Sequence, residues 1–326
     1  MKIKCVHKFE DVINVENLLI AWAEFLCGKR KRFDVQTFGC NLMDNIFGLH
    51  YDLVYRKYKH NDYKAFKVFD PKVRNIHKAS VRDRLVHHAI YRILYPYFDQ
   101  KFIFDSYSCR KNKGTHRAIN RFRNFGRIVS RNNTRTIWVL QCDIRKFFAS
   151  IDHHILKNIL AKYVKDRNVL WLFSQVINSF SIEGKIGVGL PLGNLTSQLL
   201  VNIYLNEFDQ FVKRQLKILY YIRYADDFII LAQDKACLEQ IVPKISEFLM
   251  EKLHLQIHPQ KLSIKTLSSG IDFLGYISFP NYLILRTKTK RRMLKRVNKN
   301  NLPSYSGLLK HCNGYRLTKQ LTARFT

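Results

Sequence analysis

The sequence has few acidic residues, no long apolar run and no paired cysteine motif. Only 25 residues are Asp or Glu, against 56 Lys or Arg, which gives a formal net charge of +31. No run of 18 apolar residues occurs and the N-terminus has no apolar signal-peptide core, so we expect neither a membrane span nor secretion. Seven cysteines without a Cys-x-x-Cys pair indicate reduced thiols in a cytoplasmic protein without a structural zinc site.

The rest of the composition is that of a folded, strongly basic protein. Hydrophobic residues make up 47% and aromatic residues 13% of the chain, enough for a packed interior. A length of 326 residues favours two or three subdomains. The positive excess favours a polyanionic partner, nucleic acid before membrane, with a basic protein from a basic proteome as the simpler alternative.

Hydrophobic periodicity predicts helices and strands that alternate along the chain, which favours a mixed α/β or α+β fold. Two segments are strongly basic: residues 101–135 hold ten Lys or Arg and one Asp, and residues 281–326 hold twelve Lys or Arg and no acidic residue. Helices are predicted over residues 8–27, 36–60, 80–98 (ended by Pro96), from about Asp152, and over 238–253; strands are predicted in a ribbon over 62–76 and within 136–148, 220–231 and 270–279.

The stretch YYIRYADDFIIL (220–231) places two aspartates inside an apolar strand or hairpin. Adjacent strand side chains point to opposite faces, so Asp226 and Asp227 cannot both face solvent, and a buried carboxylate needs a positive partner. Asp143 ends another apolar run, where the alternative is a helix N-cap. Magnesium binds carboxylates together with substrate phosphates, and two such ions catalyse phosphoryl displacement. The three aspartates therefore favour a metal pair and nucleotide polymerisation.

These motifs occur in the order of one enzyme family. YADD (224–227) resembles the Tyr-x-Asp-Asp box of reverse transcriptases, and DIRKFF (143–148) resembles their first acidic motif. Segments 70–89, 105–119 and 189–205 resemble three further blocks of bacterial reverse transcriptases related to group II introns. HPQKLSI (258–264) and FLGYISF (273–279) match the two blocks that follow Tyr-x-Asp-Asp. The resemblance covers roughly residues 65–280.

The resemblance implies an α+β, right-hand polymerase fold with fingers, a ferredoxin-like palm and a short helical thumb. It places an N-terminal helical extension and the fingers in residues 1–139, the palm with interleaved fingers helices in 140–280, and a short basic thumb in 281–326. It also implies RNA-directed DNA synthesis that depends on two Mg²⁺ or Mn²⁺ ions.

Site residues are carried over from the resemblance one by one. The catalytic and metal-binding residues would be Asp143, Asp226 and Asp227, with the backbone of Ile144. The dNTP would contact Lys72, Arg74, Phe148 (a steric gate against the ribose 2′-OH), Leu192 and Lys261. The primer or template would contact Tyr224, Ala225, Gly193, Ser197 and Gln198. From the residues alone, a core aromatic at Phe148 and a solvated ribbon face at Lys72 and Arg74 stay open as alternatives.

The block LPLGNLTSQ (190–198) identifies a subgroup. Group II intron, retron and retroviral enzymes usually have Gln before the Gly and Ser-Pro at the end of the block. Here Leu192 precedes Gly193 and Gln198 follows Ser197, a pattern similar to reverse transcriptases of diversity-generating retroelements. Leu192 also has a simple explanation as an apolar residue that packs on the fingers.

The subgroup resemblance implies mutagenic retrohoming, in which template RNA is copied into cDNA with errors at adenines. The implied partners are template RNA, a cDNA or primer strand, dNTPs and a small basic accessory protein that forms an oligomer. A retron-like or abortive-infection reverse transcriptase in phage defence is the alternative. A catalytically idle nucleic-acid-binding module is disfavoured because all three aspartates are present.

Overall fold

The structure is a computed structural model that describes residues 8–69 and 73–323. The chain groups into two compact units, each assembled from three segments. Unit 1 comprises residues 1–103, 145–211 and 248–256, and unit 2 comprises residues 104–144, 212–247 and 257–326. Helices and antiparallel sheets in both units confirm the predicted α+β class. Within the described part of the chain, no helix is long and apolar enough to cross a membrane.

Unit 1 is mainly helical, with one two-stranded ribbon. Its helix α2 packs on α5, and α5 packs on α9. The elements are α1 (Phe9–Ile13), α2 (Val15–Phe25), α3 (Phe33–Cys40), α4 (Leu42–Val54), β1 (Lys64–Val68), β2 (Arg74–Lys78), α5 (Val81–Asp99), a 3₁₀ turn (Phe147–Ser150), α7 (His153–Tyr163), α8 (Arg167–Asn178) and α9 (Leu195–Gln210).

Three helix predictions in unit 1 need correction. The helix predicted over residues 8–27 is two helices, because the Asn14 side chain accepts a hydrogen bond from Asn17 N–H at 2.6 Å and starts α2. The helix predicted over 36–60 is also two, α3 and α4, and it ends at Val54. Pro96 lies inside α5 instead of ending it. Buried neighbours on both sides of this proline, Tyr95 and Tyr97, hold the last turn in helical form.

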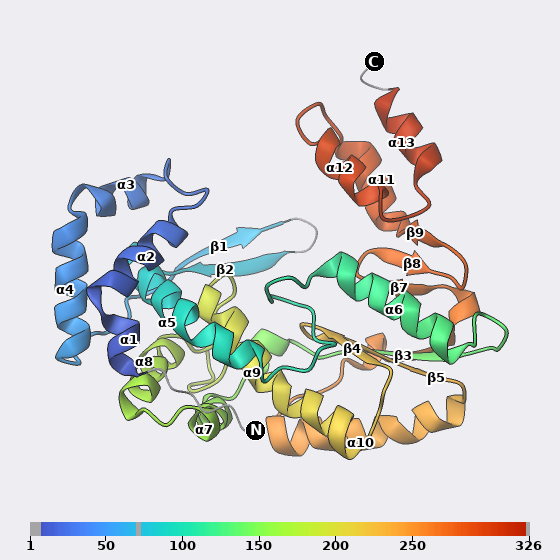
Figure 1. Ribbon diagram of the computed structural model, residues 1–326, viewed down its shortest axis with the longest axis horizontal. Helices are drawn as coiled ribbons and strands as arrows, with labels where there is room; N and C mark the ends of the chain where they lie inside the picture. Colours follow the sequence, from blue (N-terminus) through green and yellow to red (C-terminus); the bar gives the residue numbers. More distant parts are fainter. Residues whose placement is uncertain (1–7, 70–72, 324–326) are drawn as a thin grey trace. The chain divides into compact units, whose positions relative to one another are not determined.

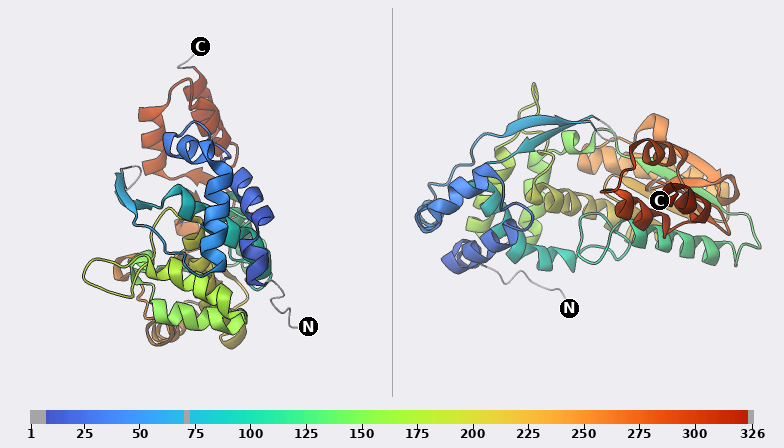
Figure 2. Two further views of the ribbon diagram at one scale, coloured as in Figure 1. Left: turned by 90° about the vertical axis from the view of Figure 1, so that its left-hand side faces the viewer. Right: turned by 90° about the horizontal axis from the view of Figure 1, so that it is seen from above.

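The predicted ribbon is confirmed as β1 and β2, which pair antiparallel from Lys64 with Lys78 to Val68 with Arg74. All of β1 is exposed. Figure 2 shows the ribbon extending beyond the helices at its base. The Asp-Pro pair 70–71, inside the range predicted for the ribbon, lies outside the described residues.

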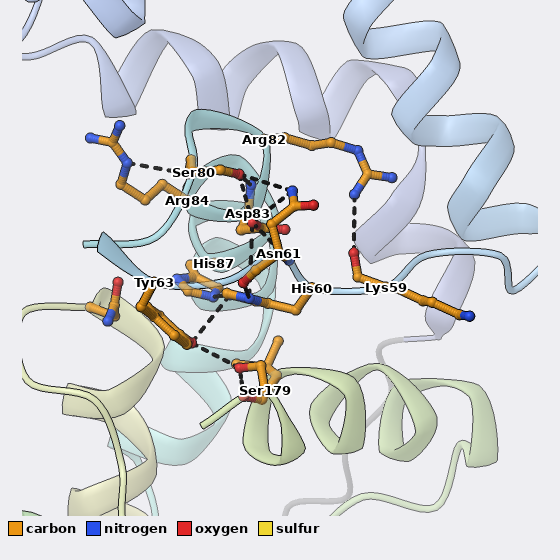
Figure 3. A network of polar contacts seen from close by, with 12 residues as sticks. Lys59, His60, Asn61, Tyr63, Ser80, Arg82, Asp83, Arg84, His87 and Ser179 are labelled. Atoms are coloured by element: carbon orange, nitrogen blue, oxygen red, sulfur yellow. Dashed lines mark hydrogen bonds and ion pairs between the residues drawn. The ribbon is translucent and has the colours of Figure 1, made fainter. Parts of the chain in front are cut away.

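A buried polar network holds the base of the ribbon (Figure 3). The completely buried Asp83 accepts hydrogen bonds from Tyr58 Oη at 2.9 Å and Ser80 Oγ at 2.6 Å. His60 Nε2 lies 3.1 Å from His87 Nε2, and burial lowers the pKa of His87 well below its ordinary value. The network fixes the loop before β1 to the first turns of α5.

Unit 2 is built on a four-stranded sheet in the order β4-β5-β3-β6, in which β3 and β5 are the central strands. Helix α6 lies along this sheet (Figure 1) and packs against β4 and β5. The elements that belong to this layer are α6 (Thr115–Val129), β3 (Trp138–Asp143), β4 (Tyr221–Tyr224), β5 (Asp227–Ala232), β6 (Ser263–Thr266) and α10 (Lys235–Leu253), which begins in unit 2 and ends in unit 1.

A second, three-stranded sheet and three short helices complete unit 2. One apolar core joins them to the first sheet: Phe122 of α6, Ile229 of β5, Phe273 of β7 and Met293 of α11 belong to the same buried cluster. The remaining elements are a π-helical segment (Phe211–Gln215) at the unit boundary, 3₁₀ turns Pro259–Lys261 and Leu267–Ser269, strands β7 (Ile271–Phe273), β8 (Tyr276–Ser278) and β9 (Leu283–Leu285), and helices α11 (Thr287–Arg296), α12 (Leu302–Leu309) and α13 (Tyr315–Thr322).

Candidate active site

The sheet register in unit 2 brings two of the three predicted aspartates together. Asp143 is the last residue of β3 and Asp227 is the first residue of β5, and the antiparallel register pairs them directly. Directly opposed residues on neighbouring strands project to the same face, so these two carboxylates are neighbours. Their side chains are in hydrogen-bond contact. Like charges in this arrangement are destabilising unless a cation balances them.

The third aspartate lies on the turn between β4 and β5. Tyr224 pairs with Asp227, which leaves Ala225 and Asp226 as the turn residues. Ala225 has a φ of 55°, in the left-handed region that such tight turns use. The backbone carbonyl of Asp226 accepts a hydrogen bond from Ile144 N–H at 3.3 Å. The stretch is therefore a hairpin, and the expectation that both aspartates are strand residues holds for Asp227 alone.

The acidic cluster is electrostatically strained. Burial raises the pKa of Asp227 to about 7, helped by its hydrogen bond to Asp143 and by the charges of Asp226 and Asp143. Lys261 opposes this rise, and its Nζ lies 2.6 Å from Oδ2 of Asp143. Lys261, predicted to contact the dNTP, thus lies beside the acids and is ion-paired with Asp143.

The donor set of this cluster fits a divalent cation that substrate helps to bind. Among the described residues, no group of three His, Cys, Asp or Glu side chains converges on a point that could hold an ion by itself. Magnesium, however, is commonly held by one or two carboxylates together with substrate phosphates. The charges of Asp226 and Asp143 help to raise the pKa of Asp227. A bound divalent ion lowers the repulsion between these adjacent carboxylates. Asp143, Asp226 and Asp227 therefore fit Mg²⁺ or Mn²⁺ bound with a nucleotide.

A buried arginine, which the sequence reasoning missed, supports the turn. Arg223 is completely buried in β4. Its guanidinium donates to the Ala225 carbonyl at 3.0 Å and to Ser106 Oγ at 3.1 Å. The bond to the Ala225 carbonyl fixes, from inside unit 2, the backbone next to Asp226. The signal was available in the sequence: a charged residue inside the apolar run YYIRY needs buried partners.

Tyr224, predicted to lie near the primer, is half-buried at the end of β4. Its hydroxyl lies 3.2 Å from Oγ1 of Thr115 in the first turn of α6. This contact ties the residue before the turn to the helix that covers the sheet.

The block 190–198 in unit 1 is fixed to the ribbon by its backbone. The Leu192 carbonyl accepts a hydrogen bond from His77 N–H at 3.0 Å, and the Asn194 side chain donates to the His77 carbonyl at 2.9 Å. Gly193, between them, has a φ of +104°, and a Cβ there would lie 2.8 Å from Cγ2 of Ile76. Only glycine fits at this position, because both the backbone angle and the close approach exclude a side chain.

The other predicted residues of unit 1 lie on neighbouring segments. Phe148, in the 3₁₀ turn, is half-buried, and its carbonyl accepts from Leu190 N–H at 2.8 Å. Arg74 is exposed at the start of β2; Lys72 lies outside the described residues. In the first turns of α9, Ser197 is buried and Gln198 half-buried.

The predicted site residues thus divide between the two units. Those in unit 2 are Asp143, Ile144, Tyr224, Ala225, Asp226, Asp227 and Lys261. Those in unit 1 are Arg74, Phe148, Leu192, Gly193, Ser197 and Gln198.

Comparisons of the sequence with known proteins show which family it resembles. A sequence model of the family described as "Reverse transcriptase (RNA-dependent DNA polymerase)" matches residues 59–278. Protein YkfC from Escherichia coli (strain K12) is 26% identical over 254 residues, 65% of this chain and 66% of YkfC. Group II intron-encoded protein LtrA from Lactococcus lactis subsp. cremoris is 24% identical over 271 residues, 63% of this chain and 44% of LtrA. This chain spans less than two thirds of the length of either relative.

A solved structure shows the same fold. Apo telomerase from Candida tropicalis, truncated from its C-terminal domain, aligns with a TM-score of 0.52 at 14% identity, covering 74% of this chain and 60% of the telomerase chain. This likeness confirms the predicted right-hand polymerase fold. The family match covers more than half of the chain and includes all three aspartates. The chain belongs to the reverse transcriptase (RNA-dependent DNA polymerase) family.

Proposed function

We propose that this chain is an RNA-directed DNA polymerase in which Asp143, Asp226 and Asp227 bind the catalytic divalent ions. The observation that carries the proposal is the register of β3 and β5, which opposes Asp143 and Asp227 next to the turn that holds Asp226. Membership of the reverse transcriptase family supports the same reading.

Each residue around the cluster has a specific task in this proposal. Two Mg²⁺ or Mn²⁺ ions, when bound, stabilise the attacking and leaving oxygens of an in-line phosphoryl displacement. The β3–β5 register sets the spacing of the carboxylates, and Arg223 holds the turn through the Ala225 carbonyl. Ile144, whose N–H is bonded to the Asp226 carbonyl, offers its own carbonyl as a further ligand. Lys261 balances the charge of Asp143.

Unit 1 supplies the residues that select the nucleotide in this proposal. Arg74 on the ribbon and Lys72 bind the triphosphate, and Phe148 excludes the ribose 2′-OH. The hydrogen bond between Phe148 and Leu190 and the one between Leu192 and His77 support a common surface for these residues within the unit. We assign residues 1–139 to the N-terminal extension and fingers, 140–280 to the palm with interleaved fingers helices, and 281–326 to the thumb. The grouping of residues 145–211 with unit 1 supports that interleaving.

Primer extension on an RNA template tests the proposal. Asp143→Asn and Asp226→Asn keep side-chain size and remove charge, so each should reduce dNTP incorporation by at least 100-fold. Asp62→Asn, at an exposed position in unit 1, is the matched control and should remain fully active. Near-normal synthesis by either active-site variant would show that the aspartates do not bind the catalytic ions.

We further infer that the enzyme serves a diversity-generating retroelement and makes errors opposite template adenine. The support is the block LPLGNLTSQ, in which Leu192 stands where group II intron and retroviral enzymes usually have Gln. A leucine side chain has no donor or acceptor, so a misaligned base loses no hydrogen bond there. The partners in this reading are template RNA, a primer or cDNA strand, dNTPs and a small basic oligomeric accessory protein.

Sequencing of cDNA made by Leu192→Gln tests the inference. One restored hydrogen bond should lower misincorporation opposite adenine roughly tenfold, with synthesis largely intact. Normal synthesis with unchanged adenine errors would leave Leu192 as a packing residue only. A genomic neighbourhood with a retron RNA or toxin gene, in place of a template repeat paired with a variable-gene repeat, would favour the phage-defence alternative.

A further inference from the structure

A groove of about 590 Å³ lies in unit 2, at the far end of β5 from the aspartates. Strand β5 starts at Asp227 and ends at Ala232, which lines the groove. A strand rises about 3.3 Å per residue, so these two residues lie roughly 16 Å apart along β5. The volume is within the range of about 300–1,000 Å³ common for binding pockets. The groove is therefore a surface separate from the catalytic cluster and large enough to receive a ligand.

Two hydrogen bonds fix the segments that form the groove. Gln233, just after β5, donates from Nε2 to the carbonyl of Val129, the last residue of α6, at 3.1 Å. Lys213, in the π-helical segment, donates from Nζ to the carbonyl of Leu219 at 2.6 Å and so holds the loop before β4. Gln233, Val129 and Leu219 all line the groove. A groove whose walls are fixed in the free protein loses little ordering entropy when a ligand binds.

The groove exposes apolar side chains to solvent. Ile128 and Leu219, from two different segments, are 49% and 72% exposed, and both line it. Buried or half-buried aliphatic residues continue this surface inward: Leu216, Ile218, Leu238 and Ile241. Single exposed apolar residues are ordinary on a protein surface, whereas apolar side chains gathered in one concave surface mark an interaction site. A ligand that covers Ile128 and Leu219 removes apolar area from water, which favours binding.

Two cations, Arg131 and Lys217, border the groove, and no acidic residue among those described lines it. Both are exposed, and neither forms an ion pair with an Asp or Glu in the described part of the chain. Their backbone φ angles, 49° for Arg131 and 53° for Lys217, are in the left-handed region. This region costs a non-glycine residue about 1–2 kcal/mol, so glycine would relieve the backbone at either position. Long cationic side chains at two such positions indicate that their charges serve a purpose at the groove.

The chemistry of the groove selects an acidic, amphipathic protein segment as its occupant. A second copy of this chain does not fit by charge, because the chain carries +31, with 25 acidic residues against 56 basic ones. Single-stranded nucleic acid is bound on aromatic platforms along a basic channel, whereas the exposed apolar side chains here are the aliphatic Ile128 and Leu219. A helix with an apolar face and with Asp or Glu on its flanks matches both the aliphatic lining and the two cations.

We propose that this groove binds an acidic amphipathic helix of a partner protein, with its apolar face on Ile128 and Leu219 and its carboxylates on Arg131 and Lys217. Such a partner is distinct by charge from the small basic accessory protein of the proposed function. None of the three aspartates lines the groove, so the bound helix does not occupy them. The proposal goes beyond the polymerase function and does not depend on it, since the groove serves as a tether and not as part of the catalytic machinery.

Fluorescence anisotropy with a designed peptide tests the apolar contact. The probe is a labelled helical peptide of about 16 residues, with Leu at i, i+3, i+4 and i+7 spacing on one face and Glu on the flanks. It is titrated with the full-length protein at physiological salt. Leu219→Glu should raise the Kd about tenfold, equivalent to about 1.4 kcal/mol. Ile186→Glu, at a 98% exposed apolar position in unit 1, is the matched control and should bind like the wild type. Both variants should keep the wild-type melting temperature, because both side chains are exposed.

Reversal of the two charges tests the basic border of the groove. Arg131→Glu combined with Lys217→Glu should weaken binding of the acidic peptide about tenfold. The same double variant should bind a peptide with Lys in place of Glu more tightly than the wild type does. Lys165→Glu combined with Lys185→Glu, at two exposed positions in unit 1, lowers the net charge equally and is the control for long-range attraction. This control should keep the wild-type preference for the acidic peptide.

The outcomes separate this proposal from simple charge attraction and from nucleic-acid binding. A wild type that binds neither peptide, or binds both equally, would overturn it. Equal losses of peptide affinity in the groove variants and in their controls would show attraction by net charge alone and would also overturn it. If Leu219→Glu lost affinity for single-stranded RNA and kept its affinity for the acidic peptide, the groove would be a nucleic-acid site instead. Primer extension by Leu219→Glu should match the wild type, and a loss at an unchanged melting temperature would contradict a site separate from catalysis.

Discussion

Without bound metal, the like charges of Asp143, Asp226 and Asp227 should destabilise the folded protein. A variant that lacks one of these charges should therefore be more stable than the wild type, although it cannot catalyse. In Asp227→Asn the side chain keeps its size and can still donate a hydrogen bond to Asp143, but it no longer adds a negative charge beside Asp143 and Asp226. We therefore expect this variant to be more stable than the wild type at pH 8 in EDTA, and to be strongly impaired in DNA synthesis.

The size and the pH range of the effect follow from the pKa of Asp227. Folding raises it from 3.8 to about 7, and one pKa unit corresponds to about 1.4 kcal/mol, so the upper limit is roughly 4 kcal/mol. Below pH 4 the carboxyl is protonated in both states and the variant gains nothing. Between pH 4 and 7 the unfolded chain releases the proton first, so the penalty on the wild type grows. Above pH 7 the penalty is complete.

Thermal unfolding with and without Mg²⁺ measures this prediction. We take half of the upper limit, about 2 kcal/mol, as the gain in the free energy of unfolding of Asp227→Asn. This gain should raise the melting temperature of the variant by roughly 4–8 °C at pH 8 in EDTA. Added Mg²⁺ should stabilise the wild type more than the variant and close the gap. Asp62→Asn controls for the loss of one acidic charge. A variant that melts below the wild type at pH 8 in EDTA would refute the like-charge argument.

Three further predictions concern unit 1. Phe148→Ala should raise rNTP incorporation relative to dNTP at least tenfold in a primer-extension assay; an unchanged ratio in an active variant would assign Phe148 to the core. Burial lowers the pKa of His87, and that of His88 to about 4, so each histidine should lower stability below pH 6.5 by up to about 1.4 kcal/mol per pH unit as the unfolded chain gains protons. Because the Asp227 penalty shrinks over the same pH range, this is measured in Asp227→Asn, and a melting temperature of that variant that is flat from pH 7 to 5 would contradict the prediction. Asn194→Ala, which leaves the His77 carbonyl without its side-chain partner, should change the error spectrum of the cDNA in the same assay as Leu192→Gln, and an unaltered spectrum would exclude a positioning effect.

Much of the fold was predictable because local patterns decide it. The apolar run that ends at Asp143 indicated β3, and the periodicity around Leu85 indicated α5. The ends of helices were harder to predict, because they depend on contacts that a periodicity does not contain. Asn14 starts a new helix through its own side chain, and the buried tyrosines around Pro96 keep α5 intact.

Contacts between distant segments explain what the sequence could not reveal about the site. The motif order indicated Asp143 and Asp227, but their direct opposition depends on a strand register that no local pattern encodes. Arg223 stands out in the sequence as a charged residue inside an apolar run, but its bond to the hydroxyl of Ser106, 117 residues away, depends on the fold. The attachment of Leu192 to His77 likewise joins two segments that share no periodicity.

The order in which the strands of the first sheet appear along the chain has a consequence for synthesis on the ribosome. Strand β3 pairs with β5 and β6, which both follow it, and Lys261 is 118 residues beyond Asp143. At translation rates of about 5–20 residues per second, β3 waits roughly 6–24 s for its partners. Both edges of this apolar strand are unpaired until β5 follows, and one edge stays unpaired until β6 follows, so the strand is prone to aggregation during this time. We therefore expect the nascent chain to depend on chaperones most strongly between the emergence of residues 143 and 261.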